Sequence, residues 1–156
     1  MDSQTAELLI TFFETYNKHY TELFTFLTEK KSKVISDDLV WLLDNLAAEQ
    51  RFIMQGNSLE SKRLAVFETI GISGVHSKEL IEMFPENYRG QIRVQLDTLT
   101  KSVNDIKRLN ADILDLVDRK LSLQEKLLNK TNDSPDTYNM KGSRVQKHSG
   151  GIIGEI

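Results

Sequence analysis

The chain has 156 residues, enough for one ordinary domain, and its 39% apolar and 28% charged residues are typical of globular or coiled-coil proteins. The absence of cysteine excludes a disulfide framework and a thiolate metal site, and a net charge of −3 offers no broad attraction for nucleic acid. The first residues, MDSQTAELL, lack the basic charge of a signal peptide, and no apolar run approaches the roughly 18 residues of a membrane span. We therefore expect a cytoplasmic protein with no membrane insertion.

Two helices are predicted in the first half of the chain. The first runs from about residue 5 to residue 30, because apolar side chains recur there at helical spacing. These side chains are rich in aromatics: Leu9, Phe12, Phe13, Tyr16, Tyr20, Leu23 and Leu27. The second helix is predicted to begin at a cap formed by Ser36, Asp37 or Asp38 and to end at about residue 70. Gly56 and Asn57 break its apolar rhythm, so we expect a bend or a frayed turn there.

A connector and a third long helix follow. Gly71 and Gly74 stop the second helix, and a short helix is predicted over residues 78–84 before Pro85. The last helix is predicted to begin between residues 86 and 91 and to end at about residue 130. Its first half carries one coiled-coil seam: Ile92, Leu96, Leu99, Val103 and Ile106. Asn110 occupies the next seam position, where an asparagine fixes register, unless it simply faces solvent after the seam shifts.

The second half of the last helix has more apolar residues than one neighbour can cover. One stripe at steps of three and four consists of Leu109, Ile113, Leu116, Leu123 and Leu127. A second stripe, roughly 100° further round the helix, consists of Leu114, Val117, Leu121 and Leu128. A single packed helix covers one stripe, so a second neighbour is required for the other.

The composition changes after Lys130. Residues 131–156 hold four of the eight glycines and one of the two prolines, and they show no apolar periodicity and no convincing strand. The sequence therefore predicts a helical bundle over residues 1–130 and a flexible, disordered tail over residues 131–156.

The residue pattern does not favour catalysis. The three histidines, His19, His76 and His148, lie far apart in the sequence, and none follows a glutamate at the spacing of a di-iron site. The acidic residues near Asp115 lie largely on the polar side of their helix. No phosphate loop, dinucleotide fingerprint, nucleophile elbow or zincin helix is present. We expect neither an enzyme nor a bound metal or cofactor, and a phosphotransfer bundle acting through His19 is a less favoured reading.

Several local patterns together resemble the FlgN family, the flagellar export chaperones for hook-filament junction proteins. A first helix ends before an acidic pair, and the second helix carries a glutamate and then a Leu-Glu-x-x-Arg stretch. The last helix carries a Leu-Asn followed by apolar residues, and a loose tail has a tyrosine shortly before a Lys-Gly. The acidic pair is Asp37-Asp38, the glutamate is Glu49, and the Leu-Glu-x-x-Arg stretch runs from Leu59 to Arg63. The Leu-Asn is Leu109-Asn110, followed by Ile113 and Leu114, and the tail pattern runs from Tyr138 to Gly142.

The resemblance implies an antiparallel helical bundle that binds the C-terminal helices of its clients in the cytosol before secretion. It also implies that Tyr138, an aromatic on a mobile tail, is a docking residue for the export gate or its ATPase, although a spacer role without contacts is the alternative. The surplus stripe on the last helix independently favours a groove for an incoming amphipathic helix. The expected client-binding residues are Leu109, Ile113, Leu114, Leu116, Val117, Leu121, Leu123, Leu127 and Leu128.

Two alternatives account for the same surplus stripe. In the first, the first two helices cover both stripes, as in an ordinary three-helix core. In the second, two copies of the chain cover each other in a homodimer, and the protein is a homo-oligomeric coiled-coil scaffold rather than a chaperone. The expected fold is the same in each case, namely an all-α antiparallel bundle or coiled coil of two long helices plus an N-terminal helix.

Overall fold

The computed structural model describes residues 1–132, 136–138 and 144–146, and helices account for most of them. In chain order the elements are α1 (Ser3–Ile35), α2 (Leu39–Asp44), α3 (Leu46–Thr69), α4 (Ser77–Met83), α5 (Glu86–Asn132), β1 (Asp136–Tyr138) and β2 (Arg144–Gln146). The all-α prediction is therefore confirmed, and α1 and α5 extend slightly beyond the predicted ends. The other residues of the predicted tail lie outside the described part of the chain.

The chain divides into two compact units, residues 1–116 and 117–156. In the second unit, β1 and β2 pair in antiparallel register with Thr137 opposite Val145. The sequence predicts no strand in this region, so the short pairing is a feature that periodicity did not reveal. Hairpins this short have no alternating apolar pattern long enough to recognise.

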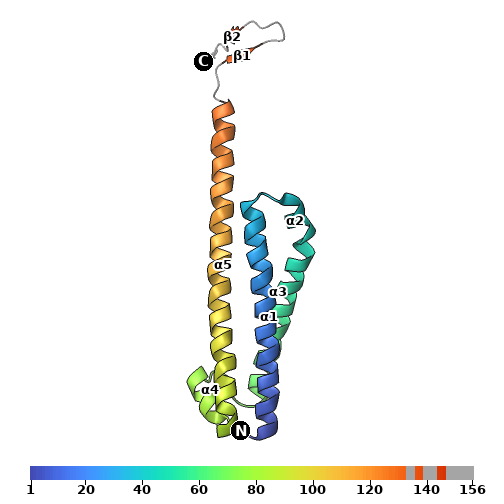
Figure 1. The fold of residues 1–156 in the computed structure, drawn as a ribbon, viewed down its shortest axis with the longest axis vertical. Helices are drawn as coiled ribbons and strands as arrows, with labels where there is room; N and C mark the ends of the chain where they lie inside the picture. Colours follow the sequence, from blue (N-terminus) through green and yellow to red (C-terminus); the bar gives the residue numbers. More distant parts are fainter. Residues whose placement is uncertain (133–135, 139–143, 147–156) are drawn as a thin grey trace, which may run out of the picture. The chain divides into compact units, whose positions relative to one another are not determined.

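The three long helices alternate in direction within the first unit. The side chain of Tyr88, near the start of α5, donates to Glu7, near the start of α1, and Lys31 near the end of α1 forms an ion pair with Asp112. These two contacts show that α1 and α5 run in the same direction (Figure 1). The chain turns back through α3, which lies antiparallel to α1.

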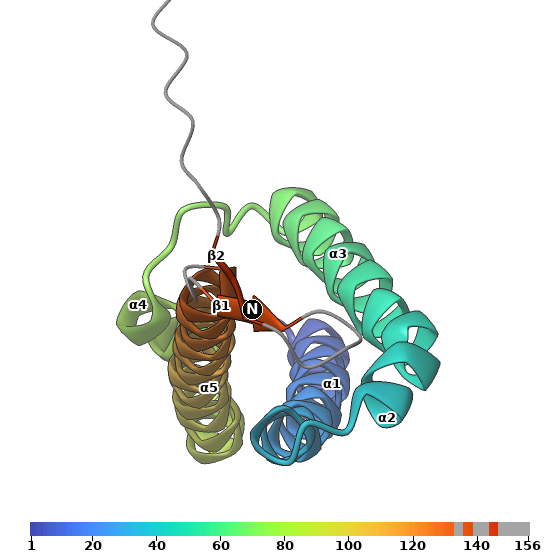
Figure 2. The ribbon, with the colours of Figure 1, turned by 90° about the horizontal axis from the view of Figure 1, so that it is seen from above.

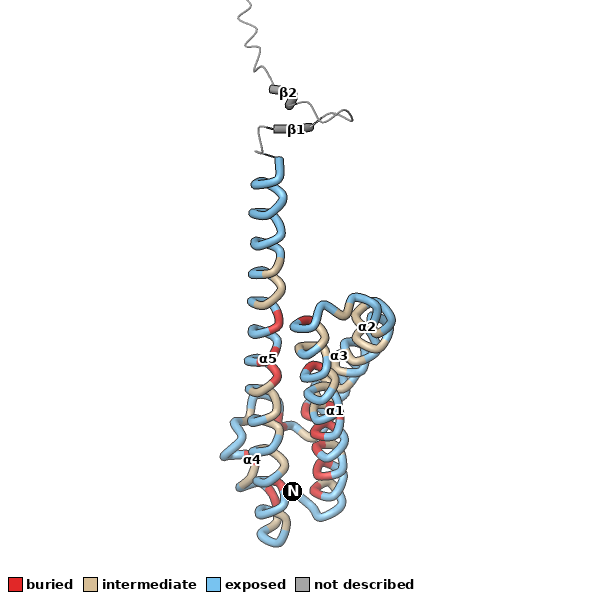
Figure 3. Tube along the Cα trace, turned by 45° about the horizontal axis from the view of Figure 1, so that its top comes forward, coloured by how far each residue is buried: buried red, intermediate tan, exposed pale blue. Residues whose placement is uncertain are grey.

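The hydrophobic core gathers where α1, the end of α3, α4 and the start of α5 meet. Its buried members are Ala6, Leu9, Ile10, Phe13, Phe67, Ile72, Leu80, Phe84 and Ile92. Of the long helices, α1 has nine buried residues, whereas α3 has only Phe67. Figure 3 shows this contrast along the trace, with buried turns frequent on α1 and rare on α3. α3 is therefore a helix with much of its surface uncovered.

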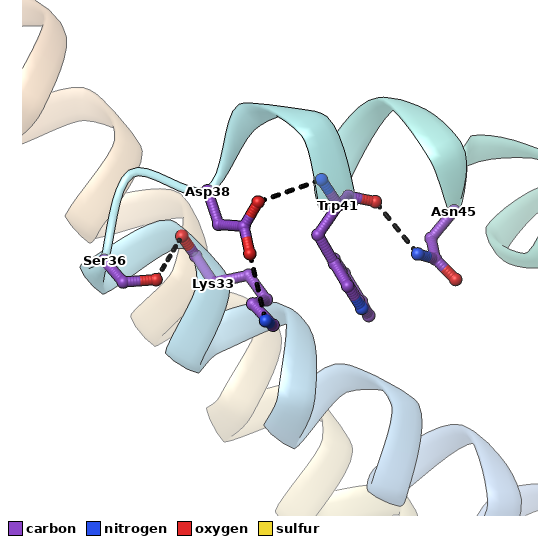
Figure 4. A network of polar contacts seen from close by, with 5 residues as sticks. All are labelled: Lys33, Ser36, Asp38, Trp41 and Asn45. Carbon is purple, nitrogen blue, oxygen red and sulfur yellow. Dashed lines mark hydrogen bonds and ion pairs between the residues drawn. The ribbon is translucent and has the colours of Figure 1, made fainter.

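A polar network ends α1 and starts α2. The Asp38 carboxylate accepts from the backbone N–H of Trp41, which caps α2, and it also pairs with Lys33 at 3.0 Å (Figure 4). Asn45 then donates its side-chain amide to the carbonyl oxygen of Trp41 and closes the short helix. The prediction of one helix from about residue 39 to 70 is therefore wrong at this point, because local capping at Asn45 divides it into α2 and α3.

α3 is continuous where the sequence predicts a bend. Gly56 lies inside the helix, and a Cβ built on it would meet Nε2 of His19 at 3.3 Å. Glycine at this position lets α3 approach α1 closely, so its role is in packing rather than in breaking the helix. The helix ends as predicted at Gly71, which together with Gly74 adopts the positive φ that favours glycine.

Candidate functional site

The last turns of α5 expose leucines that the sequence predicts as client-binding. Every residue from Leu121 to Asn132 is exposed. The large apolar side chains among them are 58–65% exposed, and we call them the distal α5 face: Leu121, Leu123, Leu127 and Leu128. Val117, at the start of the same unit, is half-buried. Large apolar side chains this exposed and this closely spaced mark an interaction surface more often than isolated ones do.

The predicted site residues before Val117 separate into covered and open positions. Leu109 and Ile113 are buried and Leu116 is half-buried, whereas Leu114 is 65% exposed. The buried turns of α5 lie on its side nearest α1 (Figure 3). Within the first unit, α1 therefore covers the first stripe and leaves the second stripe open at Leu114.

A groove between α3 and α5 is the main site that sequence reasoning missed. Figure 2 shows α3 and α5 on either side of α1, and two adjacent hollows of about 460 and 310 Å³ lie along this arrangement. Both hollows are lined by Tyr16 and Tyr20 of α1, so we treat them as one feature, the α3–α5 groove. Its further lining includes Leu23, Leu27, Phe52, Ile53, Asn57, Glu60, Arg63, Phe67, Leu96, Leu99, Val103 and Asn110.

The sequence contains a partial signal for this groove, because Ile53 lines it and shares one side of α3 with two exposed residues that do not line it, Leu46 and Leu64. Leu46, Ile53 and Leu64 are spaced by seven and eleven residues, which places them on one side of α3. The periodicity predicts an apolar face but cannot say whether anything covers it. All three side chains are 51–55% exposed, so this face of α3 is open.

A polar cluster stands in the middle of the groove. The Tyr16 hydroxyl donates to Glu60 at 2.7 Å, and Arg63 donates to both oxygens of the same carboxylate. Hydrogen bonds lower the pKa of Glu60 to about 2, and the bond from Arg63 contributes more than the bond from Tyr16. Burial is the main cause that raises the pKa of Tyr16, and its hydrogen bond to Glu60 is the second. The Arg63 guanidinium also lies 5.1 Å from the centre of the Phe67 ring. The carboxylate of Glu60 and the guanidinium of Arg63 thus neutralise each other within the cluster.

His19 is buried between α1 and α3 rather than facing solvent. It makes edge and tilted ring contacts with Tyr20 and Phe52, and burial lowers its pKa. A phosphorylatable histidine must present a ring nitrogen to a partner enzyme. The burial of His19 therefore removes the basis for the phosphotransfer reading.

The comparisons with known proteins complete this description. Residues 1–146 match the family model described as FlgN protein, which covers most of the chain. The chain belongs to the FlgN family. FlgN proteins are flagellar export chaperones, so the family assigns the chain to flagellum biogenesis and to protein binding rather than to an enzyme class. No match was found among curated proteins or among solved structures.

The FlgN match extends through the segment that contains Tyr138. This residue lies in β1, and its backbone is in register with Arg144 of β2. Among the described residues, no group of three or more metal-binding side chains occurs. Likewise, no helix in the described part of the chain is long and apolar enough to cross a membrane.

Proposed function

We propose that the chain is a cytoplasmic export chaperone for hook-filament junction proteins. It binds their C-terminal amphipathic helices, prevents their premature assembly and releases them for secretion. The observation that carries this proposal is the distal α5 face, a set of four leucines that the described chain leaves 58–65% exposed. The family membership supports a chaperone in general, and the exposed leucines supply a surface on which an amphipathic helix can pack.

The free energy available on this surface is sufficient for useful affinity. Burying one leucine side chain is worth about 1.5–3 kcal/mol, and association and ordering cost at least several kcal/mol. The four leucines lie on two stripes, so a client that covers one stripe gains two of these contributions, and a client that reaches both stripes gains four, enough for binding at about micromolar dissociation constants. Leu109 and Ile113 are already buried, so in our proposal they position α5 and do not contact the client.

Calorimetry with the C-terminal helical segment of a junction protein tests the proposal. Two double variants divide the distal α5 face by stripe, Leu121→Ser with Leu128→Ser and Leu123→Ser with Leu127→Ser. We expect at least one pair to weaken client binding by about tenfold to a hundredfold, because each lost leucine removes a buried contact. The comparison of the pairs identifies the stripe that the client covers.

Val94→Ser is the matched control, because Val94 is also on α5 and is 61% exposed but lies outside the distal α5 face. This variant should bind the client as the unchanged chain does. Circular dichroism should show the same helicity for all variants. Client affinity that is unchanged in both double variants would exclude the distal α5 face as the client site.

Tyr138 is the proposed contact with the export gate or its ATPase. We expect Tyr138→Ala to leave client affinity intact and to lower secretion of the client in cells, since an aromatic anchor contributes strongly to a small interface. Tyr138→Phe is the control that keeps the ring. Unchanged secretion in Tyr138→Ala would leave this tyrosine as a spacer.

A further inference from the structure

The outward side of α2 and of the first turn of α3 carries another group of exposed apolar side chains. Four residues there are 55–71% exposed, and we call them the α2 face: Leu39, Val40, Leu43 and Leu46. Backbone bonds from Asn45 to Trp41 and from Glu49 to Asn45 keep helical spacing across the junction of α2 and α3. The four residues therefore lie together on one side of a continuous helical path.

The inward side of α2 is held against α1. Figure 4 shows Trp41 pointing from α2 toward α1, where its ring lies 5.8 Å from the ring of Phe26. The Lys33 ammonium lies 6.0 Å from the centre of the Trp41 ring and pairs with Asp38, the cap of α2. Because these contacts fix α2 from below, the α2 face is already in position for a partner, and little ordering is needed on binding.

Acidic residues border the α2 face. Residues 34–50 contain neither lysine nor arginine, and their acidic side chains are Asp37, Asp38, Asp44 and Glu49. Ion pairs with lysines of α1 compensate the charges of Asp38 and Glu49. Asp44 is exposed one helical turn after Val40, at the edge of the α2 face. The next cation along the chain, Arg51, lies five residues beyond Leu46. The face thus combines an apolar centre with a negative edge.

We propose that the α2 face is a docking site for a partner protein that presents a short amphipathic helix whose apolar side is flanked by lysine or arginine. Leu39, Leu43 and Leu46 provide anchors at i, i+4 and i+7 for such a helix. Basic flanking residues complement Asp44, which favours this partner over others. The site lies on α2, so the proposal stands or falls separately from the distal α5 face and its client.

Charge and area disfavour two other occupants of the α2 face. Two copies of the chain that met through this face would bring their acidic edges together, and like charges repel. Four partly exposed side chains offer roughly 150–300 Å² of apolar surface on the usual ratio of free energy to area. Two such faces reach at most about 600 Å², below the roughly 1,200 Å² of a stable interface. An anionic membrane attracts basic segments rather than acidic ones.

Fluorescence of Trp41 tests the proposal, because this is the only tryptophan of the chain and it lies at the base of the α2 face. The probe is a synthetic helical peptide with leucine at the a and d positions of each heptad and lysine elsewhere. The matched control peptide carries glutamate in place of lysine. The lysine peptide should change the Trp41 emission and bind at least about tenfold more tightly than the glutamate peptide, and added salt should reduce this difference.

Variants of the full chain locate the contact. Leu39→Ser combined with Leu43→Ser should weaken binding of the lysine peptide by at least about tenfold, because two anchors are lost. Asp44→Lys should weaken it by about threefold to tenfold, since it reverses the charge at the edge of the α2 face. Leu8→Ser is the matched control, because Leu8 is 66% exposed and lies outside the α2 face. Circular dichroism should show the same helicity for all variants.

Four results overturn the proposal. The first is a lysine peptide that does not bind, and the second is equal affinity for both peptides or unchanged affinity in the double variant. The third is tighter binding to vesicles of equal parts phosphatidylcholine and phosphatidylserine than to the lysine peptide. The fourth is self-association of the chain that the double variant abolishes, because the α2 face would then be covered by a second copy.

Discussion

The two ends of α5 differ sharply in burial although both are rich in leucine. Between Glu86 and Leu116 the helix has four buried residues, Ile92, Ile106, Leu109 and Ile113. From Val117 to Asn132 it has none, and every residue after Lys120 is exposed. Apolar side chains of the same kind therefore stabilise the fold at one end and remain available for partners at the other, and a sequence pattern alone does not distinguish these roles.

The largest expected effect comes from the covered end. Ile92 is fully buried in the core, so Ile92→Ala should lower the free energy of unfolding by about 2–5 kcal/mol through lost burial and the cavity left behind. The comparable truncation in the second unit, Leu121→Ala, should change the free energy of unfolding by about 0.5 kcal/mol or less. Urea unfolding measures both values, and equal losses would contradict the contrast between the two ends.

Much of the fold could be predicted because helical periodicity is strong in α1 and α5. Both helices are long and carry apolar residues at every turn, so their existence and approximate ends follow from spacing alone. The division at Asn45 did not follow, because it depends on one side-chain bond to the carbonyl of Trp41. The continuity of α3 through Gly56 depends on His19 of another helix, which no local pattern contains.

The candidate site was predicted in part for the same reason. The surplus of leucines on α5 is visible in the sequence, and the exposure of Leu121 and Leu128 agrees with it. The burial of Leu109 depends on which face of α5 meets α1. The α3–α5 groove depends on the placement of three helices, so a linear pattern of apolar residues could indicate its walls but not its opening.

The polar cluster of the groove should contribute a moderate, pH-dependent stability. Because the pKa of Glu60 falls from 4.5 to about 2 on folding, its contribution is present above pH 4.5 and is lost as the pH falls toward 2. The side chain is 46% exposed, so solvent screening limits the gain to about 1 kcal/mol. Urea unfolding of the native chain and Glu60→Gln should therefore differ at neutral pH and converge near pH 2. A constant difference would exclude this carboxylate as the source.

The ion pair between Lys31 of α1 and Asp112 of α5 should contribute less to the free energy of unfolding. Lys31 and Asp112 are 2.6 Å apart, but both side chains are partly exposed, so Lys31→Met should cost about 0.2–1 kcal/mol. Added salt should reduce this cost, because it screens the attraction in the native chain. A loss above that of Ile92→Ala would mean that α1 is held against α5 by charge rather than by burial.

The smallest effect concerns His19, which lies where α1 and α3 are in contact. Burial lowers its pKa below the ordinary 6.5, so the unfolded chain binds a proton more readily than the folded chain. Stability is therefore complete above about pH 6.5 and decreases as the pH falls through this value toward the lower pKa of the folded state. His19→Phe keeps the aromatic contacts with Tyr20 and Phe52 and removes the titration, so it should flatten this part of the profile by a few tenths of a kcal/mol. Urea midpoints at pH 7.5 and 5.5 measure the difference, and an unchanged slope in the variant would place the titrating group elsewhere.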